Sequence, residues 1–186
     1  MDQRELVERA GRGDHDAFAS LVGASIAQLE AVARLILRDH ELARDAVQDA
    51  YIRAWRDLPG LRDSERFDAW LHRLTVNSCL DIARRRRRRP IEVDLDPIMS
   101  PAAADDTALV ADREMLERGF RHLKVDQRAV LVLHYYVGLP TSAVAETLDI
   151  PKGTVQSRLH RALAELRAAI AADERTPATV QRGLTT

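Results

Sequence analysis

Residues 141–167 read TSAVAETLDIPKGTVQSRLHRALAELR, and their pattern predicts two helices joined by a tight turn. The first helix is expected over 141–148, and it should end before Pro151, because proline lacks an N–H group and clashes with the preceding helical turn. Apolar residues on one side of this helix are Val144, Ala145 and Leu148. In the second helix apolar residues recur every three or four positions and form one stripe: Val155, Leu159, Leu163, Leu166 and Ile170.

The polar side of the second helix indicates what this pair of helices does. Thr154, Ser157, Arg158 and Arg161 project from roughly the opposite side to the apolar stripe. A second helix with hydroxyl and guanidinium groups on its free face is typical of a helix-turn-helix, which places that helix in the DNA major groove. A helical hairpin with a solvated polar face is the alternative that these residues leave open.

The composition favours an all-α fold. The chain has 186 residues, which permits one large domain or two small ones. Hydrophobic residues make up 46% of it and aromatic residues only 4%, while strand-like alternation is scarce and good helix formers dominate. The formal net charge is -1, so any binding of nucleic acid must come from a local basic patch.

No pattern in the chain suggests catalysis. There is no GxxxxGK[ST], GxGxxG or HExxH motif, and the six histidines have no metal-ligand spacing. We therefore expect no enzyme activity, no cofactor, no metal and no small-molecule substrate. The single cysteine, Cys79, is expected in the core, and a lone cysteine suits a reducing cytoplasm. No apolar run approaches the ~20 residues of a membrane span, and no signal peptide opens the chain.

A helix expected from about Leu42 to Leu58 carries two different faces. Its packing stripe contains Ala43, Val47, Ala50, Ala54 and Leu58. Another face contains Asp45, Asp49, Ile52 and Arg56, with Gln48 beside it. Like charges four residues apart cost a few tenths of a kcal/mol, and an exposed isoleucine gains nothing in water. This face is either a partner-binding surface with an apolar centre or simply a solvated face.

The next helix, expected over about 65–88, is apolar on more than one side but keeps one narrow polar stripe. That stripe contains Arg73, Asn77 and Arg84, with Trp70 and Asp81 at its edge. Asparagine and arginine beside an aromatic ring suit contacts with bases and phosphates; a core asparagine flanked by surface arginines is the alternative. The run of six arginines at 84–89 is interpreted as a phosphate-binding segment; a solvated or disordered segment is the alternative.

Changes in composition divide the chain into four parts. We expect a first domain over 1–90, a proline-containing linker over 91–111, a second domain over 112–173 and a flexible tail over 174–186. Fully extended, the linker could span about 70 Å, which is roughly two turns of B-DNA at ~34 Å each. Two DNA-contacting domains could therefore read separate sites.

Three segments in this order resemble the extracytoplasmic-function (ECF) class of bacterial RNA polymerase sigma factors. They are ELARDAVQDAYIRAW (41–55), FDAWLHRLTVNSCLDIARRRRR (67–88) and DQRAVLVLHYYVGLPTSAVAETLDIPKGTVQSRLHRALAELR (126–167). The resemblance covers about 14–89 and 112–171. It implies an all-α protein with two small helical domains, sigma region 2 and region 4, joined by a flexible linker.

The resemblance also implies roles for individual residues. Those that would dock on the β′ subunit of core RNA polymerase are Asp45, Gln48, Asp49, Ile52 and Arg56. Those that would recognise and melt the −10 promoter element, holding an extruded base, are Leu61, Arg62, Asp63, Trp70, Arg73, Asn77, Arg84 and Arg85. Those that would read the −35 element or hold its phosphates are Lys152, Thr154, Gln156, Ser157, Arg158 and Arg161.

The implied partners are core RNA polymerase, through its β′ and β subunits, promoter DNA and an anti-sigma factor. Two positions depart from the family pattern. Ala143 and Val144 follow Thr141-Ser142 where acidic residues are usual, which leaves Thr141 without a capping-box partner. Gln156 stands where a basic residue is common, and an amide there can favour adenine. The alternative function is a stand-alone helix-turn-helix regulator that binds an operator as a dimer.

Overall fold

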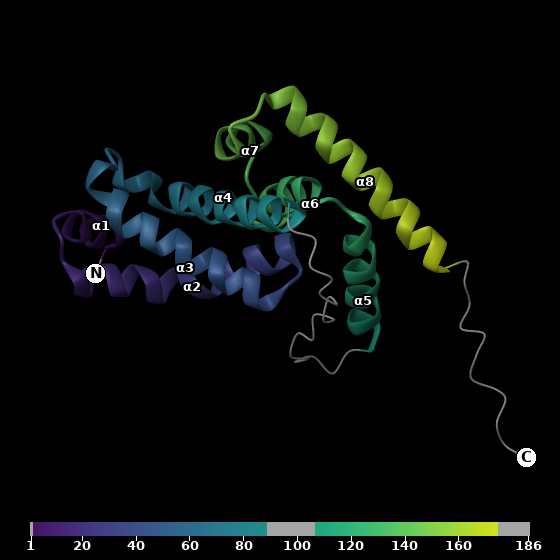
Figure 1. Cartoon of the computed structure of the whole chain (residues 1–186), viewed down its shortest axis with the longest axis horizontal. Helices are drawn as coiled ribbons and strands as arrows, with labels where there is room; N and C mark the ends of the chain where they lie inside the picture. The colour runs from purple at the N-terminus through teal and green to yellow at the C-terminus, as the bar shows by residue number, and fades with distance from the viewer. Residues whose placement is uncertain (1, 89–106, 175–186) are drawn as a thin grey trace, which may run out of the picture.

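The computed structural model describes residues 2–88 and 107–174, and the regular structure in these ranges is helical (Figure 1). The first helical domain consists of α1 (Gln3–Gly11), α2 (His15–Leu37), α3 (His40–Asp57) and α4 (Phe67–Arg88), with 3₁₀ turns η1 (Leu58–Gly60) and η2 (Ser64–Arg66) before α4. The second consists of α5 (Thr107–His122), α6 (Val125–Leu131), a π-helical turn η3 (Val132–Tyr136), α7 (Thr141–Leu148) and α8 (Lys152–Glu174). Most of the expected linker and tail lies outside the described residues.

Local side-chain caps determine where α2 and α3 begin. The carboxylate of Asp14 accepts a hydrogen bond from the Ala17 N–H at 3.0 Å, and that of Asp39 accepts one from the Leu42 N–H at 3.0 Å. Between the two helices the backbone turns at Arg38, which adopts a left-handed conformation with φ of 58°. The chain therefore reverses direction within two residues, and α2 and α3 pack side by side (Figure 1).

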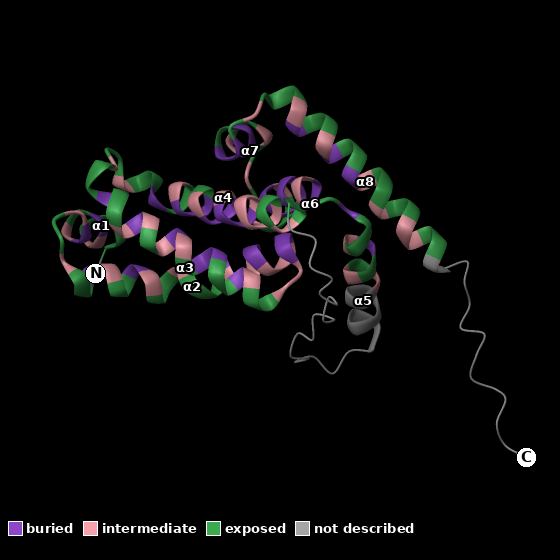
Figure 2. Ribbon diagram, in the orientation of Figure 1, coloured by how far each residue is buried: buried purple, intermediate pink, exposed green. Residues whose placement is uncertain are grey.

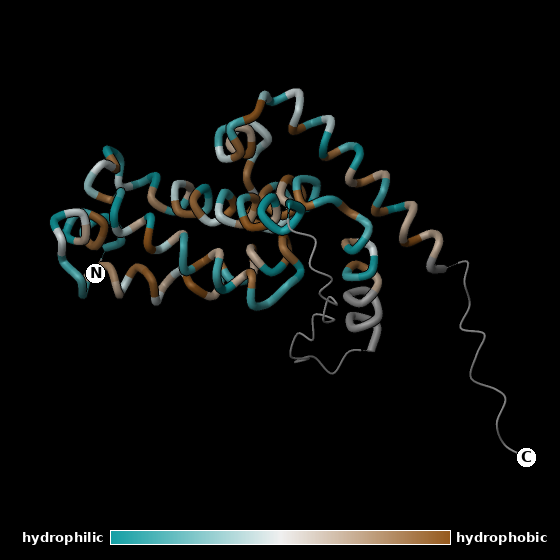
Figure 3. The backbone as a smooth tube through the Cα atoms, viewed as in Figure 1, coloured by the Kyte–Doolittle hydropathy of each residue, from teal (hydrophilic) through white to brown (hydrophobic). Residues whose placement is uncertain are grey.

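The core of the first domain is built from the predicted stripes. All five residues of the expected packing stripe are buried, and so is Ala46. Small side chains on this face let α3 approach α2 and α4 closely. The largest fully buried side chains of this domain come from α2 and α4 and include Leu29, Ile36, Phe67 and Leu71. Brown, apolar segments of the tube accordingly face one another between these helices (Figure 3).

Helix α2 contains a longer apolar stretch than the sequence analysis predicted for any part of the chain. Its 23 residues are long and apolar enough to cross a membrane by length and composition, with a mean hydropathy of 1.5 over the best window. In the structure this apolar character serves packing, because α2 lies against α1, α3, α4, α6 and η3. The expectation that no apolar run reaches membrane-span length was therefore too strict, although one such helix is weak evidence for a span.

The second domain contains the predicted helix-turn-helix. Helix α7 has the expected bounds, and its C-cap residue Asp149 is left-handed with φ of 51°. No side chain caps its N-terminus, because the N-cap residue is Pro140, and Thr141, which the sequence analysis considered for a capping box, is the first helical residue. The preceding helix, α6, changes to a π-helical turn at Val132, where the Val137 N–H donates to the Val132 carbonyl at 2.9 Å. Gly138, with φ of 83°, then redirects the chain into α7.

The two helical domains pack against each other. Helix α7 lies on α4, while α6 and η3 lie against α2 (Figure 1). Buried residues continue from one domain to the other through this contact (Figure 2). The sites carried by the two domains therefore have a defined relative position in this structure.

Candidate nucleic-acid interface

The face of α3 opposite its packing stripe is free of the bundle. Asp45, Gln48 and Arg56 are exposed, and Ile52 keeps 60% of its surface in solvent. Arg56 donates to Asp57 from Nε at 2.7 Å and from Nη2 at 2.9 Å, which raises the pKa of Arg56 and lowers the pKa of Asp57. The structure thus places an isoleucine on a surface of polar and charged groups, as the sequence predicted.

Asp49 differs from the other members of this face because it also connects two helices. Its Oδ2 accepts a hydrogen bond from the hydroxyl of Ser78 on α4 at 2.7 Å. The same oxygen lies 2.8 Å from Nη2 of Arg53, whose Nη1 is 3.7 Å from Asp81 on α4. Ser78 is fully buried. Asp49 therefore has a structural role between α3 and α4 whatever else it binds.

A cavity of about 620 Å³ lies in front of the loop that follows α3. Three of the candidate −10 residues line it: Leu61, Arg62 and Asp63. Asp63 also accepts the Glu65 N–H at 3.0 Å and so begins the turn before α4. Arg4 on α1 and Arg12, the residue directly after α1, also line the cavity. Sequence reasoning missed these two arginines, because nothing in the sequence pattern connects α1 with a loop fifty residues away.

The polar stripe of α4 lies outside that cavity. Arg73 and Arg85 are exposed, Asn77 is half-buried, and Trp70 packs beside Phe67 with ring centroids 6.1 Å apart. Arg84 is exposed, and its Nη1 lies 3.1 Å from Oδ1 of Asp81. The structure therefore divides the candidate −10 residues between a loop cavity and an open helix face.

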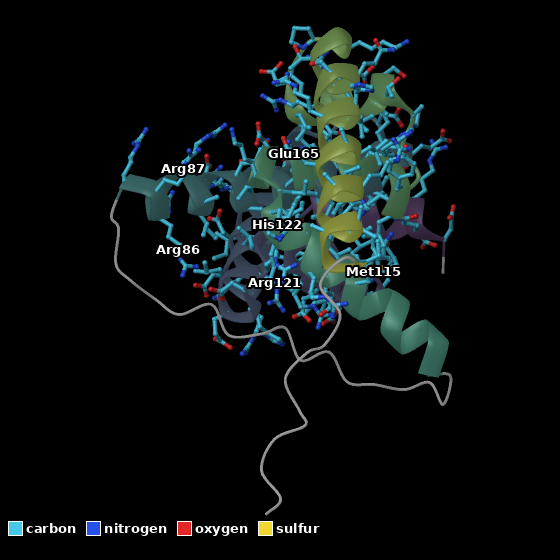
Figure 4. The ribbon with its side chains drawn as sticks, turned by 90° about the vertical axis from the view of Figure 1, so that its right-hand side faces the viewer. Arg86, Arg87, Met115, Arg121, His122 and Glu165 are labelled. Atoms are coloured by element: carbon cyan, nitrogen blue, oxygen red, sulfur yellow. The ribbon has the colours of Figure 1, made fainter. Side chains whose placement is uncertain are left out.

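The arginine run is not uniform. Nη1 of Arg86 lies 3.0 Å from Oδ2 of Asp39, the residue that caps α3, and both side chains are largely shielded from solvent. Arg87 is exposed, and Figure 4 shows the side chains of Arg86 and Arg87 leaving the end of α4 in different directions. At least one arginine of the run therefore stabilises the fold rather than standing free for phosphates.

The exposed face of α8 contains most of the candidate −35 residues. Val155, Leu159 and Ala162 are buried on its inner side, while Lys152, Gln156, Ser157 and Arg161 are exposed and Thr154 is half-buried. The Ser157 hydroxyl donates to the Thr154 carbonyl at 3.0 Å, and Nη2 of Arg161 donates to the Ser157 hydroxyl at 3.4 Å. These side chains are thus presented together by two consecutive helical turns.

Two further residues of α8 change the composition of this face. Arg158 turns toward α6, where its Nε lies 3.6 Å from Oδ2 of Asp126. His160 is exposed one helical turn after Gln156. Sequence reasoning considered the histidines only as metal ligands and so did not include His160 in the DNA-facing set.

Cys79 is fully buried in α4, and burial raises the pKa of its thiol to about 12. A thiol in this environment stays protonated near neutral pH and behaves as a small apolar side chain.

Comparisons with known proteins agree on one family. The model described as Sigma-70 region 2 matches residues 21–89, and the model described as Sigma-70, region 4 matches residues 113–166. The chain is 37% identical over 164 residues to the ECF RNA polymerase sigma factor SigM of Mycobacterium tuberculosis, which covers 87% of this chain and 81% of that protein. It is 31% identical over 176 residues to the ECF RNA polymerase sigma-E factor of Escherichia coli K12, covering 87% and 91%.

Two solved structures have a similar fold. CnrH in complex with the cytosolic domain of CnrY superposes with a TM-score of 0.66 at 27% identity, covering 92% of this chain and 98% of that one. The sigma factor RpoE in complex with the anti-sigma factor NepR from Bartonella quintana gives a TM-score of 0.66 at 25% identity, covering 84% and 98%.

Proposed function

Because this chain belongs to the ECF class of sigma-70 family RNA polymerase sigma factors, we propose that it binds core RNA polymerase in the cytoplasm and directs it to a particular set of promoters. It performs no reaction of its own. Its first domain acts as region 2 and its second as region 4.

The face of α3 is the proposed contact with the β′ subunit. An exposed isoleucine surrounded by Asp45, Gln48 and Arg56 gives an apolar centre with a polar rim, which is typical of protein interfaces. Asp49 lies at its edge and remains partly accessible, with 44% of its side chain exposed.

The loop cavity and the α4 stripe are the proposed −10 site. A cavity of about 620 Å³ is large enough for one extruded base, because ligand pockets of this size accept small organic groups. Arg73, Asn77 and Arg85 on α4 then hold the adjoining single strand through its phosphates and bases.

The exposed face of α8 is the proposed −35 reader. Gln156, Ser157 and Arg161 lie where a recognition helix contacts base edges. Lys152 lies in the first turn of α8, where a helix N-terminus favours a phosphate. Each domain binds modestly, and their connection in one chain strengthens the pair through effective concentration.

The observation that carries this proposal is the presence, in one chain, of the exposed α3 face and the α7–α8 helix-turn-helix. A stand-alone operator-binding dimer would need only the second of these. Similar folds have been solved in complex with an anti-sigma factor, which supports the further proposal that a protein inhibitor of this kind controls the chain.

The test is run-off transcription with purified core polymerase on a promoter upstream of the gene for this protein. We expect a discrete transcript that requires both the chain and core, and co-purification of the two proteins. Tight binding to operator-like duplex by the chain alone, with no binding to core, would instead establish the dimeric regulator.

A further inference from the structure

Arg128 is a buried guanidinium that connects the two domains. Only 8% of its surface is exposed. Its Nε donates to the carbonyl of Ile36 on α2 at 2.6 Å, and its Nη1 donates to the carbonyl of Leu123 at 3.0 Å. Burial lowers the pKa of Arg128 to about 10, so the group remains charged at neutral pH. The first of these bonds joins residues 92 positions apart.

The acceptor of this bond is the C-terminal end of α2. The last four carbonyls of a helix lack intrahelical partners, and the helix dipole gives this end a partial negative charge. A cation from the second domain is therefore well matched to the last turn of α2. The oxygens that Arg128 contacts belong to backbone carbonyls and not to carboxylates.

A second arginine makes the reverse connection. Arg38, immediately after α2, donates from Nη1 to the carbonyl of Glu117 on α5 at 2.5 Å. Burial is the main cause that lowers the pKa of Arg38, and the nearby Arg121 lowers it further. Each domain thus donates a guanidinium hydrogen bond to one backbone carbonyl of the other. We refer to Arg38 and Arg128 together as the arginine latch.

The latch holds the second domain over the helix that carries the proposed −10 stripe. Helix α7 packs on α4, and Nη2 of Arg66, just before α4, lies 3.5 Å from Oε2 of Glu146 on α7. Figure 1 shows α7 directly beside α4, with α8 leading away from it. In this arrangement α4, which carries the proposed −10 stripe, contacts α7, the helix that precedes the proposed −35 reader α8, whereas the two promoter sites lie about 70 Å apart, or two turns of B-DNA.

We propose that the arginine latch keeps the free chain in a closed state that cannot engage both promoter elements, and that binding to core polymerase requires its opening. This inference rests on the proposed function. Arg128, which is held by backbone carbonyls, is suited to reversible opening, because the hydrogen bonds of a charge buried without an opposite charge only partly offset its loss of hydration. When the domains separate, both guanidiniums regain water.

The test uses full-length chain with Arg38 changed and with dyes on exposed positions of the two domains. Ala24→Cys on α2 and Ala168→Cys on α8 supply the dye sites, because the native Cys79 is fully buried. Arg38→Gly removes the guanidinium and keeps the left-handed backbone, which glycine and asparagine adopt readily. Arg38→Asn is the second variant. Arg44→Gln, an exposed arginine of α3 whose ion pair is with Glu41, is the control for the lost charge.

We expect single-molecule energy transfer to show a closed population in the wild type and the control, and a larger open population in both Arg38 variants. Affinity for core polymerase, and for a single-stranded oligonucleotide of the −10 sequence, should rise together by roughly tenfold, the factor that one charge-assisted hydrogen bond supplies. The two affinities change by the same factor because each depends on the fraction of chains that are open.

Unchanged energy transfer in folded Arg38 variants would overturn the latch. If the domains separate in the Arg38 variants but affinity for the oligonucleotide does not rise, the second domain does not block the −10 stripe of α4. Loss of folding in both variants would also overturn the latch, since the proposal requires that each domain stays folded when the contacts of Arg38 are removed. If transcription with core fails for every version of the chain, the proposed function fails; if transcription succeeds and the Arg38 variants equal the wild type, only the latch fails.

Discussion

Asp45 and Asp49 lie one helical turn apart on α3, but they differ in what a substitution would disturb. Asp45→Arg changes only an exposed carboxylate, so we expect weaker binding to core polymerase and an unchanged thermal transition. Asp49→Arg additionally leaves the buried Ser78 hydroxyl without its acceptor and places a cation beside Arg53. The unpaired hydroxyl alone should lower the free energy of unfolding by about 1–3 kcal/mol.

These two effects are separated by measuring affinity for core and thermal unfolding on the same samples. Glu165→Arg, the same charge reversal on an exposed residue of α8 (Figure 4), serves as the control for charge. Unaltered affinity of the Asp45 variant for core would show that the α3 face is not the contact.

Arg158 and Arg161 are both arginines of α8, yet only Arg161 lies on its exposed side. Arg161→Ala should reduce transcription from −35-containing promoters by an amount equivalent to ~1–3 kcal/mol, as for a good base contact. Arg158→Ala removes an ion pair with Asp126 and should instead cost up to about 1 kcal/mol of stability. The measurement is a set of promoters with single −35 substitutions. A uniform loss across all of them for Arg161→Ala would indicate a phosphate contact.

At the scale of elements, the turn into α7 depends on a single glycine. Gly138 has φ of 83°, and a Cβ added there would meet no atom within 4 Å, so the cost of a substitution is conformational. Gly138→Ala should lower the free energy of unfolding by roughly 1 kcal/mol. Gly23→Ala, in the interior of α2 and equally uncrowded, should raise it by roughly 0.5–1 kcal/mol. Denaturant titration of both variants checks the opposite signs; equal effects would mean that the turn at Gly138 is not strained by a side chain.

The same elements show which parts of the fold the sequence could predict. The bounds of α7 were predicted correctly because Pro140 immediately precedes it and Pro151 follows three residues after its last residue. The π-helical turn at 132–136 was not predicted, since a segment that is apolar on all sides has no period to indicate a change of helix type. The structural ties of Asp49 and Arg86 join residues 29 and 47 positions apart, and no periodicity within one helix reveals such a partner.

At the scale of the whole molecule, the exposed features were predictable and the closed arrangement was not. The α3 face and the polar side of α8 follow from spacing along single helices. The packing of α7 on α4 and the position of Arg128 depend on how two helical domains meet, which no spacing within a single helix indicates. The length of the expected linker limits how far the second domain can lie from the first, but it does not determine where the second domain packs.

This arrangement predicts that the two domains unfold together. Buried residues continue across the contact, and Arg128 loses its Ile36 partner if either domain melts. Scanning calorimetry of the wild-type chain should therefore give one transition whose calorimetric and van't Hoff enthalpies agree. Raising the salt to about 1 M, where charges are screened beyond ~3 Å, should weaken the exposed Arg66–Glu146 pair without dividing the transition, because the Arg128 bond is buried, the Arg38 bond is partly buried, and both end on carbonyls. Two resolved transitions in the wild type at low salt would show instead that the domains are thermodynamically independent.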